Sequence, residues 1–230
     1  MEREIGSATW YVRDDADEVA YQGEDPGGVV VAGGITAARN RALKDAWSRG
    51  LACVQVSDDL EMMGKFTDPT KGKPRWEYCQ FHVAVLSVRG RMAIHHAMLG
   101  GAAPTPNPLN FRRDESTHNF IVGDFIVVEP CEVMFDETFR LKEDYDYTLQ
   151  HLARYGKVLR ADTIAPRFTH RTNAGGAVDY RTKEREREAI LKLLRKWGNN
   201  VQRHPRKPET EIVLRWKGAP PWYRPDEVPA

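Results

Sequence analysis

Residues 29–56 of this chain read VVVAGGITAARNRALKDAWSRGLACVQV. The stretch opens with β-branched residues, which favour a buried strand. Two glycines then break the strand, and Thr36 is expected to cap a helix that ends at Gly50. A second strand is expected over residues 51–56. A strand, a Gly-rich turn, a helix and a strand in succession form a βαβ unit, which predicts a parallel sheet with helices on its faces.

The composition is that of a globular protein. The chain has 230 residues, of which 41% are hydrophobic and 29% charged, enough for one large domain or two small ones. It holds no run of about 18 apolar residues that could span a bilayer, and its start lacks the order of a signal peptide. Cys53, Cys79 and Cys131 form no CxxC pair, which argues against a disulfide framework or a zinc site. We therefore expect an intracellular protein without a membrane partner.

Positive charge is concentrated near the C-terminus. Between Arg181 and Lys217, twelve Lys or Arg residues stand against five Glu, a balance of +7, although the whole chain carries only +1. Basic residues interleaved with Trp and His could line a nucleic-acid backbone. A solvated helix face is the alternative, because the Glu residues can pair with neighbouring Arg. The candidates for DNA contact are Lys192, Arg195, Lys196, Arg203, Arg206 and Lys207.

Two segments could hold a phosphorylated ligand. In residues 33–40 (GGITAARN) a Gly-rich turn precedes a helix whose free N–H groups favour anions, and Arg39 could add a charged contact. Such turns are also common in α/β proteins without a ligand. Residues 57–59 (SDD) follow the second strand, and carboxylates at a strand end can hold a divalent ion together with phosphate oxygens. A solvated acidic turn is the alternative there.

An acidic helix start and a late histidine are further candidates. Residues 142–144 (KED) open a helix that is expected to end at Gly156. The helix dipole alone explains acidic residues in a first turn, but a carboxylate there could also act as a general base. His170 follows a short strand, and residues 173–176 (NAGG) could form a hinge that closes over a substrate. A surface or core histidine is the alternative.

The rest of the chain is less regular. We expect a strand over residues 120–128 (FIVGDFIVV) and a helix over residues 183–197. Residues 67–75 are predicted to be an exposed loop, and residues 77–98 mix strand and helix signals. Residues 100–108 (GGAAPTPNP) are too rich in Gly and Pro for a regular element to be predicted.

Taken together, these segments resemble the core of the GT-A nucleotide-sugar glycosyltransferases. The shared order is ARN at a helix start, an acidic triplet at the next strand end, xED at a helix start and a late histidine. More specifically, the chain resembles the TET-associated glycosyltransferases of bacteriophages over residues 29–181. The segments that carry this resemblance are residues 99–108 (LGGAAPTPNP), 135–137 (FDE), 141–150 (LKEDYDYTLQ) and 175–181 (GGAVDYR).

The resemblance implies an α/β protein with the GT-A fold, a Rossmann-like open mixed sheet with helices on both faces. Residues 1–181 would form the catalytic domain. Residues 182–230 would form a basic C-terminal helix and tail that pack on this domain and possess the charge for DNA contact.

The resemblance also implies a role for each candidate residue. Asp59 and His170 would bind Mn²⁺ or Mg²⁺. Asp144 would be the base of an inverting transfer, with Glu143 as its substitute. The family motif D-x-D begins with Ser57 here, which leaves open a mechanism that depends little on metal. The residues expected around the nucleotide and its sugar are Gly33, Gly34, Arg39, Asn40, Asp58, Gly175 and Gly176.

The implied reaction moves a sugar from a nucleotide-diphosphate sugar, such as UDP-glucose or a similar UDP-sugar, to 5-hydroxymethylcytosine in DNA. TET-type dioxygenases make such hydroxymethylated bases, and the implied location is the cytoplasm of a phage-infected bacterium. Two alternatives remain open. One is a GT-A enzyme that acts on a protein, a glycan or a small molecule, and the other is an inactive DNA-binding module that kept the fold.

Overall fold

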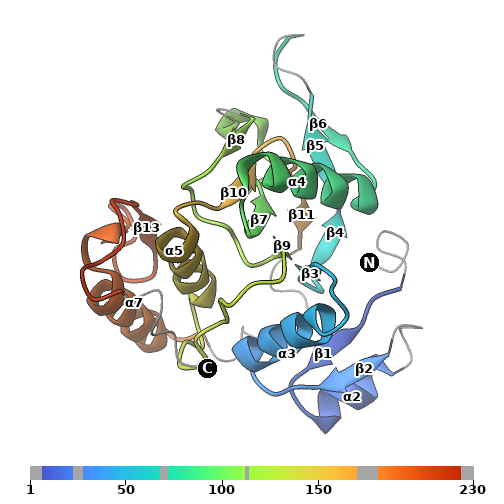
Figure 1. The fold of residues 1–230 in the computed structure, drawn as a ribbon, viewed down its shortest axis with the longest axis horizontal. Helices are drawn as coiled ribbons and strands as arrows, with labels where there is room; N and C mark the ends of the chain where they lie inside the picture. Colours follow the sequence, from blue (N-terminus) through green and yellow to red (C-terminus); the bar gives the residue numbers. More distant parts are fainter. Residues whose placement is uncertain (1–6, 23–27, 68–71, 112–113, 170–180, 224–230) are drawn as a thin grey trace.

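The computed structural model describes residues 7–22, 28–67, 72–111, 114–169 and 181–223. At its centre lies a five-stranded mixed sheet in the order β3-β9-β7-β10-β8 (Figure 1). β9 runs antiparallel to β3 and β7, whereas β7 and β10 are parallel. The sheet and its helices confirm the predicted α/β class. The strands are β3 (Cys53–Val56), β7 (Leu99–Ala102), β8 (Glu115–Ser116), β9 (Phe125–Val128) and β10 (Leu159–Ala161).

Helices cover both faces of the sheet because the side chains of β9 alternate between two cores. Phe125 and Val127 pack in one hydrophobic cluster with residues of α4. Ile126 and Val128 pack in the other cluster with residues of α3 and α5. Successive residues of a strand face opposite sides, so each face of β9 is apolar and buried. The helices are α3 (Ile35–Trp47), α4 (Phe81–His95) and α5 (Glu143–Tyr155).

The two strands of the predicted βαβ unit form, but they belong to different sheets. β2 (Val29–Val31) pairs in parallel with β1 (Trp10–Val12), whereas β3 pairs with β9. The prediction of one parallel sheet through β2 and β3 is therefore wrong, because the earlier strand β1 takes the place beside β2. Helix α3 packs against both β1 and β3. Its N-cap is Gly34, so the prediction that Thr36 caps it is also wrong, and Thr36 is buried within the helix.

β7 lies where no regular element was predicted. Gly100 and Gly101 are both buried in this strand. A Cβ on Gly100 would lie 2.4 Å from Sδ of Met92, and a Cβ on Gly101 would lie 2.5 Å from Cγ2 of Ile121. Glycine lets helix α4 and the segment before β9 approach the strand closely. The two glycines therefore serve close packing and do not form a loop.

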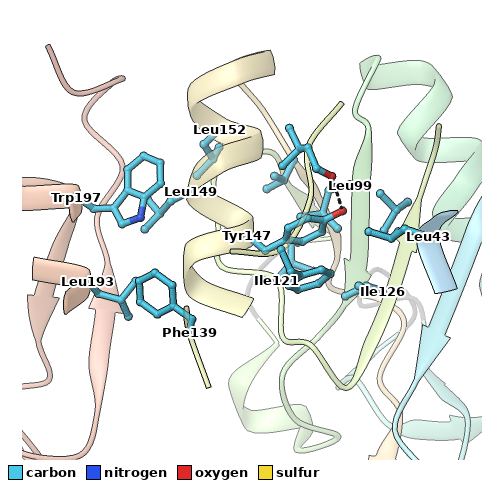
Figure 2. Packing of buried hydrophobic residues seen from close by; sticks show 14 of the residues in the cluster. Leu43, Leu99, Ile121, Ile126, Phe139, Tyr147, Leu149, Leu152, Leu193 and Trp197 are labelled. Atoms are coloured by element: carbon cyan, nitrogen blue, oxygen red, sulfur yellow. Dashed lines mark hydrogen bonds between the residues drawn. The ribbon is translucent and has the colours of Figure 1, made fainter. Parts of the chain in front are cut away.

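Helix α7 (Lys183–Trp197) forms where its 3.6-residue period predicted a helix, and it packs on α5. Leu193 and Trp197 are at most 1% exposed and share a cluster with Leu149 and Leu152 of α5. Figure 2 shows α5 between these side chains of α7 and those of the sheet. The basic C-terminal segment therefore shares a hydrophobic core with the sheet.

The remaining elements form the edges of the molecule. β4 pairs with β11, β12 pairs with β13, and the hairpin β5–β6 projects from the body (Figure 1). Of the strand expected over residues 120–128, only β9 is a strand. Among the described residues no helix combines the length and the apolar character needed to cross a bilayer. The elements at the edges are α2 (Asp15–Tyr21), β4 (Leu60–Met62), β5 (Gly64–Phe66), β6 (Trp76–Tyr78), β11 (Arg167–Phe168), β12 (Val201–Arg203), β13 (Ile212–Leu214) and the 3₁₀ turns Pro108–Asn110 and Gly198–Asn200.

Candidate active site

The loop before β9 brings α3, β3 and α5 together. Arg39 of α3 donates through Nη1 to Oε1 of Gln55 at 3.2 Å and to the carbonyl oxygen of Gly123 at 3.1 Å. Nε2 of Gln55 donates back to the carbonyl oxygen of Arg39 at 3.0 Å. The N–H of Gly123 donates to Oδ2 of Asp144 at 3.1 Å. Gly123 thus links the guanidinium of Arg39 to the first turn of α5.

The position of Gly123 leaves room for a side chain only if the guanidinium of Arg39 moves. A Cβ there would lie 2.7 Å from Nη2 of Arg39 and 3.2 Å from Cβ of Asp144. The sequence reasoning missed this residue because it took residues 120–128 as one strand. A Gly-Asp pair inside an apolar run is the signal that could have shown the break.

Asp144 is a partly buried carboxyl with a strongly altered affinity for protons. Its pKa is raised from 3.8 to about 7, chiefly by burial and next by the negative charge of Glu143. The N–H of Gly123 and the charge of Arg39 act in the opposite direction, and Asp124 raises the pKa further. A carboxyl that exchanges its proton near neutral pH has the property that a general base requires.

Glu143, the alternative base, is occupied by an ion pair. It is buried, and its Oε1 lies 3.5 Å from Nε of Arg39. Arg39 was predicted to reach a nucleotide, but its guanidinium is directed into the protein, toward Glu143, Gln55 and Gly123. These contacts indicate that Arg39 and Glu143 stabilise the geometry of the site.

The acidic turn that follows β3 lies beside the same loop. The N–H of Ser57 donates to the carbonyl oxygen of Asp124 at 2.8 Å, directly after Gly123 in the chain. Asp58 is exposed, and its Oδ2 accepts from the hydroxyl of Tyr21 at 2.9 Å. The end of β3, the loop before β9 and helix α2 therefore meet at this turn.

Asp59 faces the segment that leads toward the predicted histidine. Its carbonyl oxygen accepts from the N–H of Thr169 at 3.0 Å, where β11 pairs with β4. His170 itself lies outside the described residues, and so do Gly175 and Gly176. The structure thus places Thr169 beside the acidic turn.

The acidic turn offers carboxylates, but the described residues do not assemble a metal site there. Across the described ranges, no three His, Cys, Asp or Glu side chains are grouped so that they could hold a metal ion. Asp58 and Asp59 offer carboxylate oxygens, and Mg²⁺ is commonly held by one or two carboxylates together with water and phosphate oxygens. A metal ion at this turn would therefore need ligands other than Asp58 and Asp59.

The other residues predicted around a nucleotide have different surroundings. Nδ2 of Asn40 donates to the carbonyl oxygen of Phe135 at 3.0 Å, and the N–H of Phe135 donates to Oδ1 of Asn40 at 2.8 Å. The amide of Asn40 is thus occupied in fixing a loop. Gly33 has a φ of 87°, and Gly34 caps α3 without a side-chain acceptor. Nothing lies within 4 Å of a Cβ on Gly34, so there is space beside the helix start.

Two of the six predicted DNA contacts hold α7 on the domain. Nζ of Lys196 lies 2.9 Å from Oδ2 of Asp136 and 2.9 Å from Oδ1 of Asp146, which is almost fully buried. Nζ of Lys192 lies 4.0 Å from the ring centroid of Phe139. These contacts give both lysines a structural role.

The other four predicted DNA contacts are exposed. Arg195 lies on α7, while Arg203, Arg206 and Lys207 lie on β12 and the loop that follows it. Nη1 of Arg203 donates to a carbonyl oxygen of that loop at 2.7 Å. Nζ of Lys207 pairs with Oε1 of Glu211 at 2.7 Å. Helix α7 and the hairpin β12–β13 thus present the basic side chains that a nucleic acid could reach.

Comparison of the chain with protein-family models, with curated proteins and with solved structures finds no match. The contacts described above define a mixed α/β protein with a polar, acidic site where β3 ends. They are the basis for the function proposed below.

Proposed function

We propose that this chain is a glycosyltransferase of the GT-A class that transfers a sugar from a nucleotide-diphosphate sugar, such as UDP-glucose, to 5-hydroxymethylcytosine in DNA. The observation that carries this proposal is that the loop at Gly123 and Asp124 contacts both the Asp144 carboxyl, whose pKa burial raises to about 7, and the acidic turn of residues 57–59. A base and a pair of carboxylates suited to a metal-bound diphosphate are the two parts that such a transfer needs. The mixed sheet with helices on both faces is compatible with the GT-A fold.

Asp144 acts on the acceptor in the proposed reaction. Its carboxylate removes the proton of the hydroxymethyl group as that oxygen attacks the anomeric carbon of the donor. The bond between this carbon and the diphosphate breaks, and the diphosphate leaves with the electron pair. Attack from the side opposite the leaving group inverts the configuration at the anomeric carbon, and the step requires no nucleophilic side chain.

The donor lies at the acidic turn in this proposal. Asp59 would hold Mn²⁺ or Mg²⁺ with His170, and Asp58 would face the ribose or the donor sugar. When bound, the ion would offset the charge that grows on the leaving diphosphate. The start of α3 at Gly33 and Gly34 offers backbone N–H groups to phosphate oxygens. Gly175 and Gly176 keep the ligand-binding role that the resemblance implies.

Arg39 is a positioning residue in this proposal and does not contact the nucleotide. Gln55 holds its guanidinium, which in turn holds the carbonyl oxygen of Gly123. The N–H of Gly123 then fixes one oxygen of Asp144. Asn40 acts indirectly in this proposal, because its side-chain amide fixes the loop at Phe135.

DNA is the proposed acceptor because exposed cations gather at the C-terminal end of the chain. Arg195, Arg203, Arg206 and Lys207 would contact phosphates, which provide most of the salt-dependent affinity for DNA. A hydroxymethyl group on cytosine C5 projects into the major groove of a duplex, so it can be reached without base flipping. Such an enzyme would work in the cytoplasm of a phage-infected bacterium.

The decisive experiment is a product assay. The protein is incubated with Mn²⁺, a panel of nucleotide sugars and DNA that contains 5-hydroxymethylcytosine, and the digested nucleosides are weighed by mass spectrometry. We expect one donor to add the mass of its sugar to 5-hydroxymethyl-2′-deoxycytidine only, with DNA containing 5-methylcytosine and the Asp144→Asn variant as controls. Transfer to a protein, glycan or small-molecule acceptor instead would identify the alternative enzyme. Binding to DNA without any transfer would identify the inactive DNA-binding module.

A further inference from the structure

A polar pocket of about 340 Å³ lies between β5, α4 and the segment after β10, and it shares no residue with the candidate active site. Its volume is at the lower end of the range of about 300–1,000 Å³ that is usual for ligand sites. Strands, a helix and turns from four parts of the chain form its wall. The polar side chains that line it are Lys65, Thr67, Ser87, Arg91, Asp114 and Thr163.

Two cations of this pocket are available to an oxyanion. Lys65 is exposed on β5. Arg91 of α4 is fixed in place, because its Nη1 donates to the carbonyl oxygen of Asp114 at 3.0 Å and lies 3.6 Å from Oε2 of Glu115. Among the described residues both contacts involve Nη1, so Nε and Nη2 can donate to a ligand. A guanidinium held in this way is well suited to bind a phosphate.

Hydroxyl groups complete the lining. Ser87 lies one turn before Arg91 on the same face of α4, and Thr67 follows β5. The Oγ1 of Thr163 is buried and has no hydrogen-bond partner in the part of the chain that the structure describes. Buried polar atoms in proteins are nearly always paired, so an unpaired one in a pocket wall indicates a place for a ligand atom.

The hairpin β5–β6 extends this polar surface. It projects from the body next to α4 (Figure 1), and Lys73 and Arg75 are exposed on the segment that leads into β6. The guanidinium of Arg167 stacks 4.4 Å from the ring centroid of Trp76 and adds charge at the start of β6. The opposing charges are Asp114 in the pocket, Glu115 beside Arg91 and Glu77 opposite Lys65 in the hairpin. A ligand with several phosphates would therefore find cations beyond the pocket as well as in it.

We propose that this pocket binds a phosphate group of a nucleic-acid strand, with Lys65 and Arg91 as charged contacts and Thr163 as a hydroxyl contact. Lys73 and Arg75 then contact neighbouring phosphates of the same strand. Phosphate contacts of this kind position a protein on DNA without reading its sequence. The choice of DNA as the partner rests on the proposed function, and the pocket gives the acceptor a second contact surface, separate from the hairpin β12–β13.

The test measures binding of a fluorescein-labelled duplex of unmodified DNA by fluorescence anisotropy over a range of salt concentrations. Lys65→Gln is expected to weaken binding and to reduce the magnitude of the salt slope by about 0.9, the value for one lost phosphate contact. Lys44→Gln is the matched control, because Lys44 is an exposed lysine of α3 and lies outside the pocket lining. Equal affinities and slopes for the two variants would overturn the proposal.

Thr163→Val separates a ligand contact from a structural role. The substitution replaces an unpaired hydroxyl by a methyl group of the same shape, so the melting temperature should stay level or rise while affinity for DNA falls. Unchanged affinity would overturn the assigned contact. Asp114→Asn removes the opposing charge and should strengthen binding, whereas Asp15→Asn on α2 should leave it unchanged. Weaker binding by Asp114→Asn would also overturn the proposal.

Inorganic phosphate distinguishes the source of the ligand. In an NMR titration of the whole protein, phosphate is expected to shift the amide signals of Thr163 and Arg91. These shifts should be smaller in the Lys65→Gln variant. If phosphate shifts these signals while no pocket variant alters DNA binding, the ligand is a free phosphate compound and the nucleic-acid assignment is wrong. The DNA assay contains neither sugar donor nor hydroxymethylcytosine, so its result does not depend on whether the transferase activity is found.

Discussion

The N–H of Gly123 donates to Oδ2 of Asp144 at 3.1 Å, while the carbonyl oxygen of Gly123 accepts from Arg39, also at 3.1 Å. One residue of the main chain therefore holds both the candidate base and the cation beside it. The backbone fixes the carboxyl on its second oxygen as well, because Oδ1 of Asp144 accepts from the N–H of Tyr145 at 2.9 Å.

The first prediction concerns stability and pH. The folded pKa of Asp144, about 7, lies above its ordinary value of 3.8, so its ionisation destabilises the folded state as pH rises through that window. Asp144→Asn should therefore exceed the parent in free energy of unfolding by about 1–3 kcal/mol above the window and by almost nothing below it. A pKa shift of this size corresponds to a difference of about 4 kcal/mol at most in the free energy of unfolding. The expected difference is smaller because the side chain of Asp144 is partly exposed. Urea unfolding at both ends of the window checks this, and an equal gain at both ends would contradict it.

The second prediction concerns the rate of transfer. If Asp144 is the base, kcat/KM should rise about tenfold per pH unit on the acid side and level off above about pH 7. Asp144→Asn should lower kcat by a factor of about 10²–10⁴ with little change in donor affinity. Glu143→Gln, which breaks the pair with Arg39, should shift the profile and retain turnover. An unchanged profile in the active Asp144→Asn variant would place the base elsewhere.

The third prediction compares two glycines. Gly123→Ala would place a Cβ 2.7 Å from Nη2 of Arg39, so it should destabilise the fold by about 1–3 kcal/mol and remove activity. Gly90→Ala is the matched control, because nothing lies within 4 Å of a Cβ at this helical position. The free energy of unfolding of this control should rise by up to about 1 kcal/mol. Thermal unfolding of both variants measures the difference, and a tolerated Gly123→Ala would show that the loop can move without loss.

The fourth prediction concerns Lys196. Without this lysine, the buried carboxyl of Asp146 keeps Trp197 as its remaining partner across the α5–α7 contact. Lys196→Gln should therefore lower the free energy of unfolding by about 3 kcal/mol. Affinity for DNA should stay close to that of the parent wherever the variant is folded. Chemical denaturation and anisotropy together test this, and a large loss of DNA affinity without a loss of stability would return Lys196 to the DNA surface.

The fifth prediction concerns the hairpin β12–β13. Joint replacement of Arg203, Arg206 and Lys207 by Gln should reduce the magnitude of the salt slope by up to about 0.9 for each lost phosphate contact. Stability should change by less than about 1 kcal/mol, because exposed ion pairs contribute little. A salt slope equal to that of the parent would remove this hairpin from the interface.

Much of the fold could be predicted from local sequence. Helices α3, α5 and α7 combine a 3.6-residue apolar period with a clear end, such as Gly156 with its φ of 73° after α5. β7 could not be predicted, since Gly100 and Gly101 are explained only by Met92 and Ile121, which pack against them. The pairing of β2 with β1 is likewise a choice between partners that no local pattern records.

The candidate site, too, could be predicted from local sequence only in part. Asp144 and the acidic turn were identified from residue type and position in their elements, and the structure connects both to the loop before β9. The direction of the Arg39 side chain was not predictable, because its partner Gly123 lies 84 residues away in the chain. Gly123 has no functional group of its own, so its importance becomes visible only in three dimensions.

The bond from the indole N–H of Trp197 to Oδ1 of Asp146, 2.7 Å long, has a practical consequence for anyone who shortens this protein. A truncated chain that stops before Lys183 would uncover Leu149 and Leu152, and the carboxylate of Asp146 would lose its partners Lys196 and Trp197. Such a fragment should be recovered from inclusion bodies. The proposed catalysis and DNA binding are thus best separated by point substitutions in the undivided chain.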